Sequence, residues 1–259
     1  MPDELDMLQN PDRPLEAPKR ASTVPPIINL PVVVLAVLGL ILGIHLVLQL
    51  GGDGLQTWAV AIFAFNTGRF GPEPVNQIAG SKWWSFLTYG LLHADWMHVG
   101  FNSIWLAIFS KPVAIRLGAL RYLVLLGVSV IAGAAAALLV HWGQNYAMIG
   151  ISAGVSGVLA AAIPIMYAKN SEIGMGSEIG MDYLKPLRPL EILTNGRAMT
   201  FTAMWMGLTL ITAASQYITG AAFLEERPVA WEAHVGGFIV GFIGFYLLDR
   251  RRVPRAIVM

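Results

Sequence analysis

The chain has 259 residues, of which 56% are hydrophobic and 13% are charged, and its formal net charge is +1. Soluble domains carry about 25% charged residues, so this composition excludes an ordinary water-soluble globule and argues against a nucleic-acid-binding or disordered chain. The sequence contains no cysteine, which excludes thiol catalysis, thiolate metal sites and disulfide bonds. We therefore expect a membrane protein.

Apolar stretches set the expected architecture. The polar, proline-rich residues 1–26 predict a disordered tail. A membrane-spanning helix needs about 20 mostly apolar residues, and six stretches come close to this: Ile27–Leu50, Trp96–Ser110, Leu117–Val140, Ser152–Tyr167, Ala198–Tyr217 and Trp231–Leu248. We predict an all-α, polytopic bundle of six transmembrane helices over residues 27–249, followed by a short basic tail, residues 250–259.

The distribution of basic residues predicts the orientation. With six spans, both termini share one side of the membrane, and that side holds all the lysines and arginines except Arg69, Lys82 and Arg227. Cytoplasmic loops carry such an excess of positive charge. We expect an integral protein of a bacterial cytoplasmic membrane with both termini in the cytoplasm.

Polar side chains inside the spans are few, and each is costly to bury in hydrocarbon. His98, Ser152 and His234 lie in the second, fourth and sixth spans. At a rise of 1.5 Å per residue, the three residues lie about 20, 25 and 22 Å above the cytoplasmic ends of their spans. They are therefore expected at about the same depth in the membrane. Asn102 lies one turn deeper than His98, on the same helix face.

This layer contains the groups of a hydrolytic site. Ser152 can act as a nucleophile if a base lies within hydrogen-bond reach. His234 is the candidate base, because a neutral imidazole accepts a proton near pH 7. His98 and Asn102 can donate hydrogen bonds to a developing oxyanion, and the backbone N–H of Ser152 at a helix start is a further donor.

Three motifs resemble those of the rhomboid intramembrane serine proteases. They are His93-Ala-Asp-Trp-Met-His98-Val-Gly-Phe-Asn102, Gly150-Ile-Ser152-Ala-Gly154-Val-Ser156-Gly157 and His234-Val-Gly-Gly237-Phe-Ile-Val-Gly241. The resemblance implies a Ser152–His234 dyad without a carboxylate and an oxyanion site formed by His98, Asn102 and the Ser152 N–H. Close packing of the sixth span on the fourth is implied through Gly237 and Gly241. Structural roles near the site are expected for His93, Gly150 and Gly154.

The resemblance also implies a function. It implies a serine endopeptidase that cleaves membrane-anchored proteins in or near a transmembrane helix through an acyl-enzyme, with no cofactor, metal or nucleic acid. The fifth span, with Met204, Trp205 and Met206, and the Phe223–Val229 loop are expected to admit the substrate. The chain departs from the family at the Trp84-Ser85 pair, where Trp-Arg is common, at Ala153 in place of a glycine, and at Ser156 in place of an aromatic residue.

Two other functions remain open. The first is a catalytically inactive rhomboid-like protein that binds transmembrane clients, which the intact Ser152 and His234 argue against. The second is a transporter or channel, which the lack of a carboxylate in the middle of a span disfavours. The absence of a His-Glu-x-x-His motif and of two buried carboxylates excludes zinc-type and aspartyl-type intramembrane proteases.

Overall fold

The computed structural model describes residues 29–72, 74–75, 78–168, 184–219 and 230–250. The expected tail over residues 1–26, nearly all of the 250–259 tail and the Phe223–Val229 loop lie outside these ranges.

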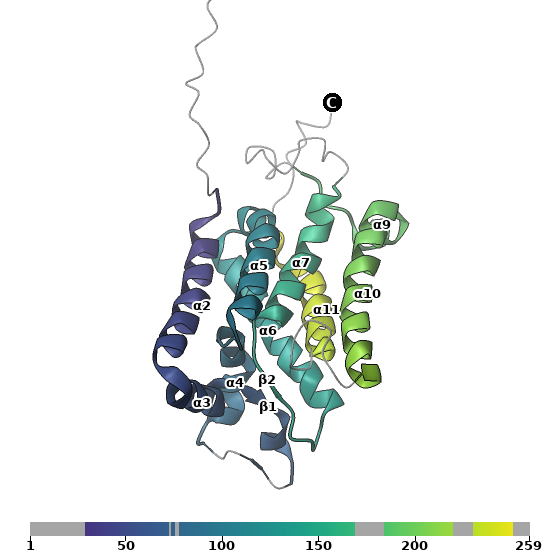
Figure 1. Cartoon of the computed structure of the whole chain (residues 1–259). Coiled ribbons are helices and arrows are strands. Elements are labelled where there is room, and N and C mark those ends of the chain that lie inside the picture. Colours follow the sequence, from purple (N-terminus) through teal and green to yellow (C-terminus); the bar gives the residue numbers. More distant parts are fainter. Residues whose placement is uncertain (1–28, 73, 76–77, 169–183, 220–229, 251–259) are drawn as a thin grey trace, which may run out of the picture.

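The described chain forms an all-α bundle, as predicted (Figure 1). Its longest helices are α2 (Val32–Leu50), α5 (Trp96–Leu117), α6 (Ala119–Val140), α7 (Ser152–Met166), α10 (Gly196–Thr219) and α11 (Trp231–Leu248). The shorter elements are α3 (Gly52–Phe63), α4 (Ser81–Thr88), α9 (Pro189–Thr194) and the 3-10 turns η1 (Thr67–Phe70) and η2 (Tyr89–Leu91). Among the described helices, α2, α6 and α11 are each long and apolar enough to cross a membrane, so the full count of six spans stays a prediction.

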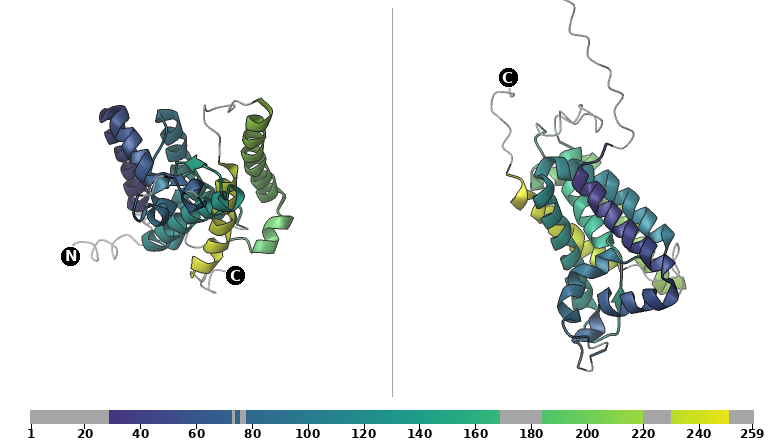
Figure 2. Two further views of the ribbon diagram at one scale, coloured as in Figure 1. Left: turned by 90° about the horizontal axis from the view of Figure 1, so that it is seen from below. Right: turned by 90° about the vertical axis from the view of Figure 1, so that its left-hand side faces the viewer.

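Helix α7 forms the centre of the bundle. Every residue from Ala153 to Ile165 is buried, as expected for a helix that is apolar on all sides. Helices α5, α6 and α11 pack around α7, α2 packs on α5, and α10 stands at the periphery (Figure 2). Ser152, the first residue of α7, therefore lies at the end of the core that faces α3 and α4, which we call the loop end.

Glycines bring α6, α7 and α11 into backbone contact. A Cβ at Gly241 on α11 would overlap the backbone of Gly157 on α7. A Cβ at Gly236 on the same helix would lie 2.7 Å from the carbonyl oxygen of Ala132 on α6. Small residues permit this close approach of helices inside a membrane, so the three helices form one tight unit.

The loop end is built on the carboxyl terminus of α3. The last carbonyls of a helix have no partner within the helix, and here three of them accept hydrogen bonds from side chains. Ala61 accepts from Arg69 (2.7 Å), Ile62 from Trp84 (3.1 Å) and Phe63 from Thr88 (2.9 Å). These bonds join α3, η1 and α4, which lie between the first two predicted spans.

Helix α5 is longer than expected. It continues past the predicted end at Ser110 to Leu117, and Gly118, with φ of +79°, is the single residue that separates it from α6. The extension includes Arg116, which is 1% exposed. Its guanidinium donates to both carboxylate oxygens of Asp249 at the end of α11, at 3.1 and 3.0 Å. This pairing lets a charged residue remain within the packed helix.

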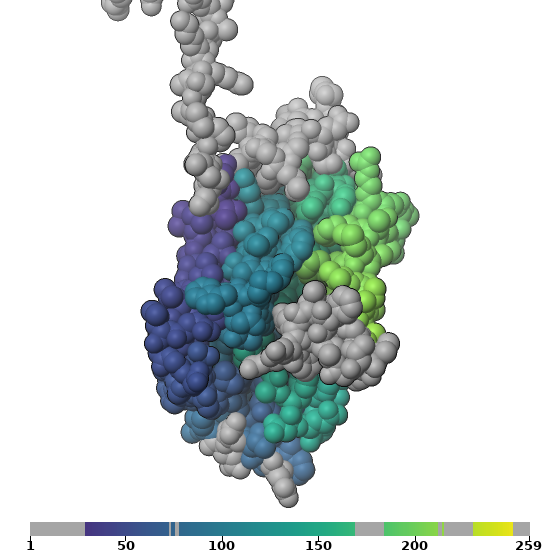
Figure 3. All heavy atoms as spheres, in the orientation of Figure 1, coloured from purple at the N-terminus to yellow at the C-terminus, as the bar shows by residue number. Residues whose placement is uncertain are grey.

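The outer surface of the bundle is apolar. Helices α2, α5 and α10 share one side of the molecule (Figure 3). Large exposed apolar side chains on these three helices include Leu40, Leu46, Phe101, Ile104, Ile108, Met204, Leu208 and Ile211. An apolar surface of this extent suits contact with lipid. The first and last described residues lie at the same end of the bundle, opposite the loop end (Figures 1 and 2).

Candidate active site

A short two-stranded sheet leads the chain into Ser152. Strand β1 (Phe65–Asn66) pairs antiparallel with strand β2 (Ala147–Met148). After β2, the N–H of Gly150 donates to the carbonyl of Tyr89 at 3.0 Å, and the Tyr89 hydroxyl donates to the carbonyl of Val130 on α6 at 2.8 Å. The start of α7 is thus tied to both the loop end and α6, and Ser152 itself is half-buried.

His98 lies in the first turn of α5 and faces the residues before Ser152. The carboxylate of Asp95 caps the helix by accepting from the His98 N–H at 2.8 Å, as an aspartate at this position typically does. A Cβ at Gly150 would lie 2.7 Å from His98 Nε2, and Gly150 has a φ of +114°. Only glycine fits there without strain, and the imidazole occupies the space beside it.

Asn102 lies one turn along α5 from His98 and is 7% exposed. Its Nδ2 donates to the His98 carbonyl at 3.0 Å. An amide nitrogen carries two hydrogens, so this bond leaves Nδ2 with a second donor.

His234 lies in the first turn of α11, and its helix meets α7 beside Ser152. A Cβ at Gly237, one turn after His234, would lie 3.0 Å from the Cα of Ala153. Ala153 and Ala233, the neighbours of Ser152 and His234, both lie against Gly133 of α6. The structure therefore gathers α5, α7 and α11 around the residues that the sequence singled out, and their roles stay predictions.

Two more histidines lie behind His98. The ring of His93 meets the ring of His98 edge to face, with 5.0 Å between the centroids, and burial lowers the pKa of His93 to about 3. His45 of α2 is 1% exposed and packs edge to face on Trp96 at 4.6 Å. Within the described ranges, no three His, Cys, Asp or Glu side chains are arranged to hold a metal ion.

The positions that depart from the family pattern are all buried. Ser85 and Ser156 are fully buried, and neither hydroxyl has a hydrogen-bond partner among the described residues. Ala153 is fully buried between α6 and α11. In the absence of an arginine at position 85, the buried arginine of the loop end is Arg69, which donates to the carbonyls of Ala61, Ala64 and Ser81.

Aromatic side chains fill the space between α5 and α10. Trp205 of α10 meets Trp105 edge to face at 5.5 Å and Phe109 at 6.2 Å between ring centroids. Met204 is 62% exposed, on the outer surface of α10. Trp205 therefore lies at the contact between the two helices, whereas Met204 faces outward.

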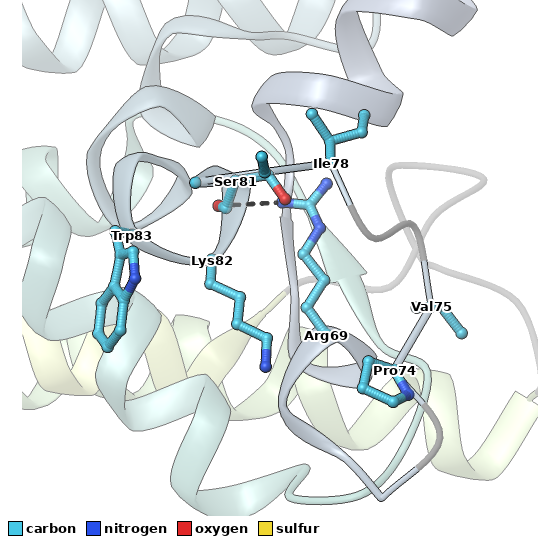
Figure 4. Close-up of a pocket in the computed structure, with 9 residues that line it drawn as sticks. Arg69, Pro74, Val75, Ile78, Ser81, Lys82 and Trp83 are labelled. Carbon is cyan, nitrogen blue, oxygen red and sulfur yellow. Dashed lines mark hydrogen bonds between the residues drawn. The ribbon is translucent and has the colours of Figure 1, made fainter.

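The loop end also contains a cavity of about 250 Å³, which lies away from this layer. Arg69, Lys82 and Trp83 line it together with Pro74 and neighbouring residues (Figure 4). Neither Ser152 nor His234 lines the cavity, and the Arg69 guanidinium is already engaged with backbone carbonyls. The cavity is therefore a feature of the loop end and is separate from the candidate active site.

Sequence reasoning missed the role of two polar residues near the site. His141 and Glu232 are absent from the predicted site, yet their side chains approach each other to 3.0 Å. The only signal in the sequence was the position of Glu232, two residues before His234.

The amino-acid sequence is similar to that of known proteins. The rhomboid domain model matches residues 80–251. The chain is 25% identical over 210 residues to rhomboid protease GlpG of Pectobacterium atrosepticum, a match that covers 81% of this chain and 60% of that protein. It is also 25% identical over 142 residues to YdcA of Bacillus subtilis, whose name places it among the rhomboid proteases, covering 55% of this chain and 66% of that protein. The chain thus spans less than two thirds of the length of either relative.

Proposed function

Because the chain belongs to the rhomboid family, whose domain model matches residues 80–251, we propose that it is an intramembrane serine endopeptidase. The observation that carries the proposal is the meeting of α7 and α11 beside Ser152 and His234, with His98 near the loop that precedes Ser152. Two relatives named as rhomboid proteases support the same reaction class.

Ser152 and His234 form the catalytic dyad. His234 takes the proton from the Ser152 hydroxyl as the oxygen attacks the peptide carbonyl, and it then gives that proton to the leaving amine. This step forms the acyl-enzyme and breaks the C–N bond. His234 next takes a proton from water, and the resulting attack releases the new carboxyl terminus and restores the serine.

His98 and Asn102 stabilise the oxyanion of both tetrahedral intermediates. His98 Nδ1 accepts from the Ala94 N–H at 3.5 Å, so the neutral ring carries its proton on Nε2, the nitrogen that faces Gly150. Asn102 adds its second Nδ2 hydrogen, and the N–H of Ser152 at the start of α7 is the third donor. Preorganised donors of this kind stabilise developing charge strongly in a site of low dielectric constant.

Water reaches the site from the loop end. Ser152, His98 and His234 are each half-buried, whereas the rest of α7 after Ser152 is buried almost to its end. Hydrolysis of the acyl-enzyme needs such access, and the apolar surface of the bundle keeps the remainder of the site dry.

The substrates are membrane-anchored proteins that are cut in or near a transmembrane helix. A helical peptide bond is shielded and hydrogen-bonded, so segments with helix-breaking residues near the cut are preferred. Substrate enters between α5 and α10, where Trp205 contacts Trp105, and α10 moves to admit it. No cofactor takes part in this reaction.

The protein is placed in a bacterial cytoplasmic membrane with both termini in the cytoplasm. All described lysines and arginines except Arg69 and Lys82 lie on segments at the end opposite the loop end or leading to it. The positive-inside rule assigns that end to the cytoplasm, so the site opens toward the outer face.

A reporter assay tests the proposal. The purified chain is reconstituted with a tagged single-pass membrane protein, and the cleavage products are sized. We expect cleavage by the wild type and none by Ser152→Ala or His234→Ala. A wild type that binds the reporter without cutting it would instead support the inactive, client-binding alternative.

A further inference from the structure

An ion pair joins the end of α6 to the start of α11. His141, which caps the carboxyl terminus of α6, places Nε2 3.0 Å from Oε1 of Glu232. The Glu232 side chain is 2% exposed and that of His141 is 14% exposed. Glu232 lies in the first turn of α11, where the helix dipole favours a negative charge.

Both nitrogens of the His141 ring face acceptor oxygens. Nδ1 lies 3.1 Å from Oε1 of Gln144, opposite the contact with Glu232. The ring therefore bridges Gln144 and Glu232 through its two nitrogens. The ring also stacks on Tyr146, with 3.9 Å between centroids and 16° between planes, so three contacts fix its orientation.

The partners of His141 belong to the segment that leads into Ser152. Gln144 and Tyr146 immediately precede β2, and the backbone of both is held by Thr67: its hydroxyl donates to the Gln144 carbonyl at 2.7 Å, and its N–H donates to the Tyr146 carbonyl at 3.0 Å. A few residues later the chain reaches Gly150 and Ser152. The ion pair therefore connects the first turn of α11, which carries His234, to the segment that carries the nucleophile.

The close packing of helix α11 starts just after Glu232. Its close contacts with α6 and α7 begin at Ala233, Gly236 and Gly237. In the described part of the chain, the contact of Glu232 with His141 adds a polar restraint to the packing of the first turn of α11.

We propose that the His141–Glu232 pair is a positioning clamp, which sets the distance and orientation of His234 relative to Ser152. The inference rests on the proposed function. Neither residue touches the reacting atoms: Glu232 lies two positions before His234, and side chains two apart on a helix point in nearly opposite directions.

A second ion pair on the same helix provides a matched control. Asp249, at the far end of α11, pairs with Arg116 and is also largely buried. Seventeen residues separate it from Glu232, which is about 25 Å along a helix. Loss of either pair destabilises α11, but only the pair with Glu232 lies beside the site.

The experiment compares Glu232→Ala, Glu232→Gln, Asp249→Ala and Asp249→Asn in detergent, well below the unfolding temperature of each. It measures kcat and KM on the reporter, the rate at which a fluorophosphonate labels Ser152, and the unfolding temperature. For Glu232→Ala we expect kcat and labelling rate to fall on the order of tenfold to a hundredfold with KM unchanged. Glu232→Gln keeps an acceptor for His141 and should recover most of this loss. Both Asp249 variants should keep the wild-type kcat but unfold at a lower temperature.

Equal losses of kcat in Glu232→Ala and Asp249→Ala, or no loss in either, would overturn the clamp and leave a purely structural ion pair. A Glu232→Ala effect confined to KM would also overturn it. If the wild type neither cleaves nor reacts with the probe, the proposed function itself fails, which is a distinct result.

Discussion

Gly237 of α11 lies in backbone contact with Ala153 of α7. A Cβ at position 237 would be 3.0 Å from the Cα of Ala153 and would overlap its carbonyl group. Gly237 lies one turn after His234, and Ala153 directly follows Ser152. The closest approach of the two helices therefore occurs beside the two side chains to which we assign catalysis.

This contact predicts the effect of adding one methyl group. Gly237→Ala should abolish cleavage and lower the free energy of unfolding by at least the roughly 1–3 kcal/mol typical of an overpacked core, because the neighbouring atoms are backbone and cannot turn aside. Gly43→Ala on α2 is the matched control, since no atom other than the adjacent residues and the backbone of its own helix lies within 4 Å of its Cβ position. Cleavage assays and thermal unfolding check the pair, and an active Gly237→Ala enzyme would contradict this packing.

The assignment of oxyanion donors predicts a loss in kcat. His98→Ala and Asn102→Ala should each lower kcat by about a hundredfold to a thousandfold, with little change in KM, because the donors act on charge that develops only in the transition state. Ser103→Ala, one residue after Asn102, removes a hydroxyl without a described partner and should keep wild-type kcat. Equal losses in all three variants would assign the effect to the packing of α5.

The hydrogen bonds of the buried Arg69 should stabilise the loop end. Arg69→Gln removes donors from the carbonyls of Ala61 and Ala64, and each unsatisfied buried carbonyl costs about 1–3 kcal/mol. We expect a clearly lower unfolding temperature. Lys82 lines the same cavity, but its side chain is exposed. Lys82→Gln should therefore change the free energy of unfolding by no more than about 0.5 kcal/mol. Similar effects of both variants would argue against a specific role of Arg69.

The buried His93 should make the stability of the folded protein depend on pH. Burial lowers the pKa of His93 to about 3, whereas an unfolded histidine titrates near 6.5. Between these two pH values the unfolded chain binds the proton more readily than the folded chain. His93 therefore leaves the free energy of unfolding unchanged above about pH 6.5 and lowers it as the pH falls toward 3. His93→Asn should flatten the fall in unfolding temperature between pH 6.5 and pH 4, and an unchanged slope would show that His93 does not contribute.

The sequence predicted the all-α bundle and the approximate ranges of its long helices. Hydropathy locates a buried helix such as α7 because every side of it is apolar, and the glycines of α11 mark the close contact with α7. The end of α5 was misjudged because Lys111, directly after Ser110, resembles a charge at a membrane boundary. The helix continues past it to Leu117 and includes Arg116, whose partner Asp249 is 133 residues away.

Contacts between distant polar residues could not be predicted. The side chains that complete the end of α3 come from Arg69, Trp84 and Thr88, and nothing in their local sequence indicates which carbonyls they reach. The His141–Glu232 pair has the same character, since its members are 91 positions apart. Such pairs depend on how the helices are arranged, which periodicity alone does not determine.

The most direct test of the account is to find the residue that a fluorophosphonate modifies. The serine oxygen displaces fluoride from phosphorus, which leaves a stable adduct that peptide mass spectrometry can map. We predict a single adduct on Ser152 that is lost in Ser152→Ala and strongly reduced in His234→Ala. An adduct on another serine such as Ser156, or undiminished labelling of Ser152 in His234→Ala, would contradict a Ser152–His234 dyad.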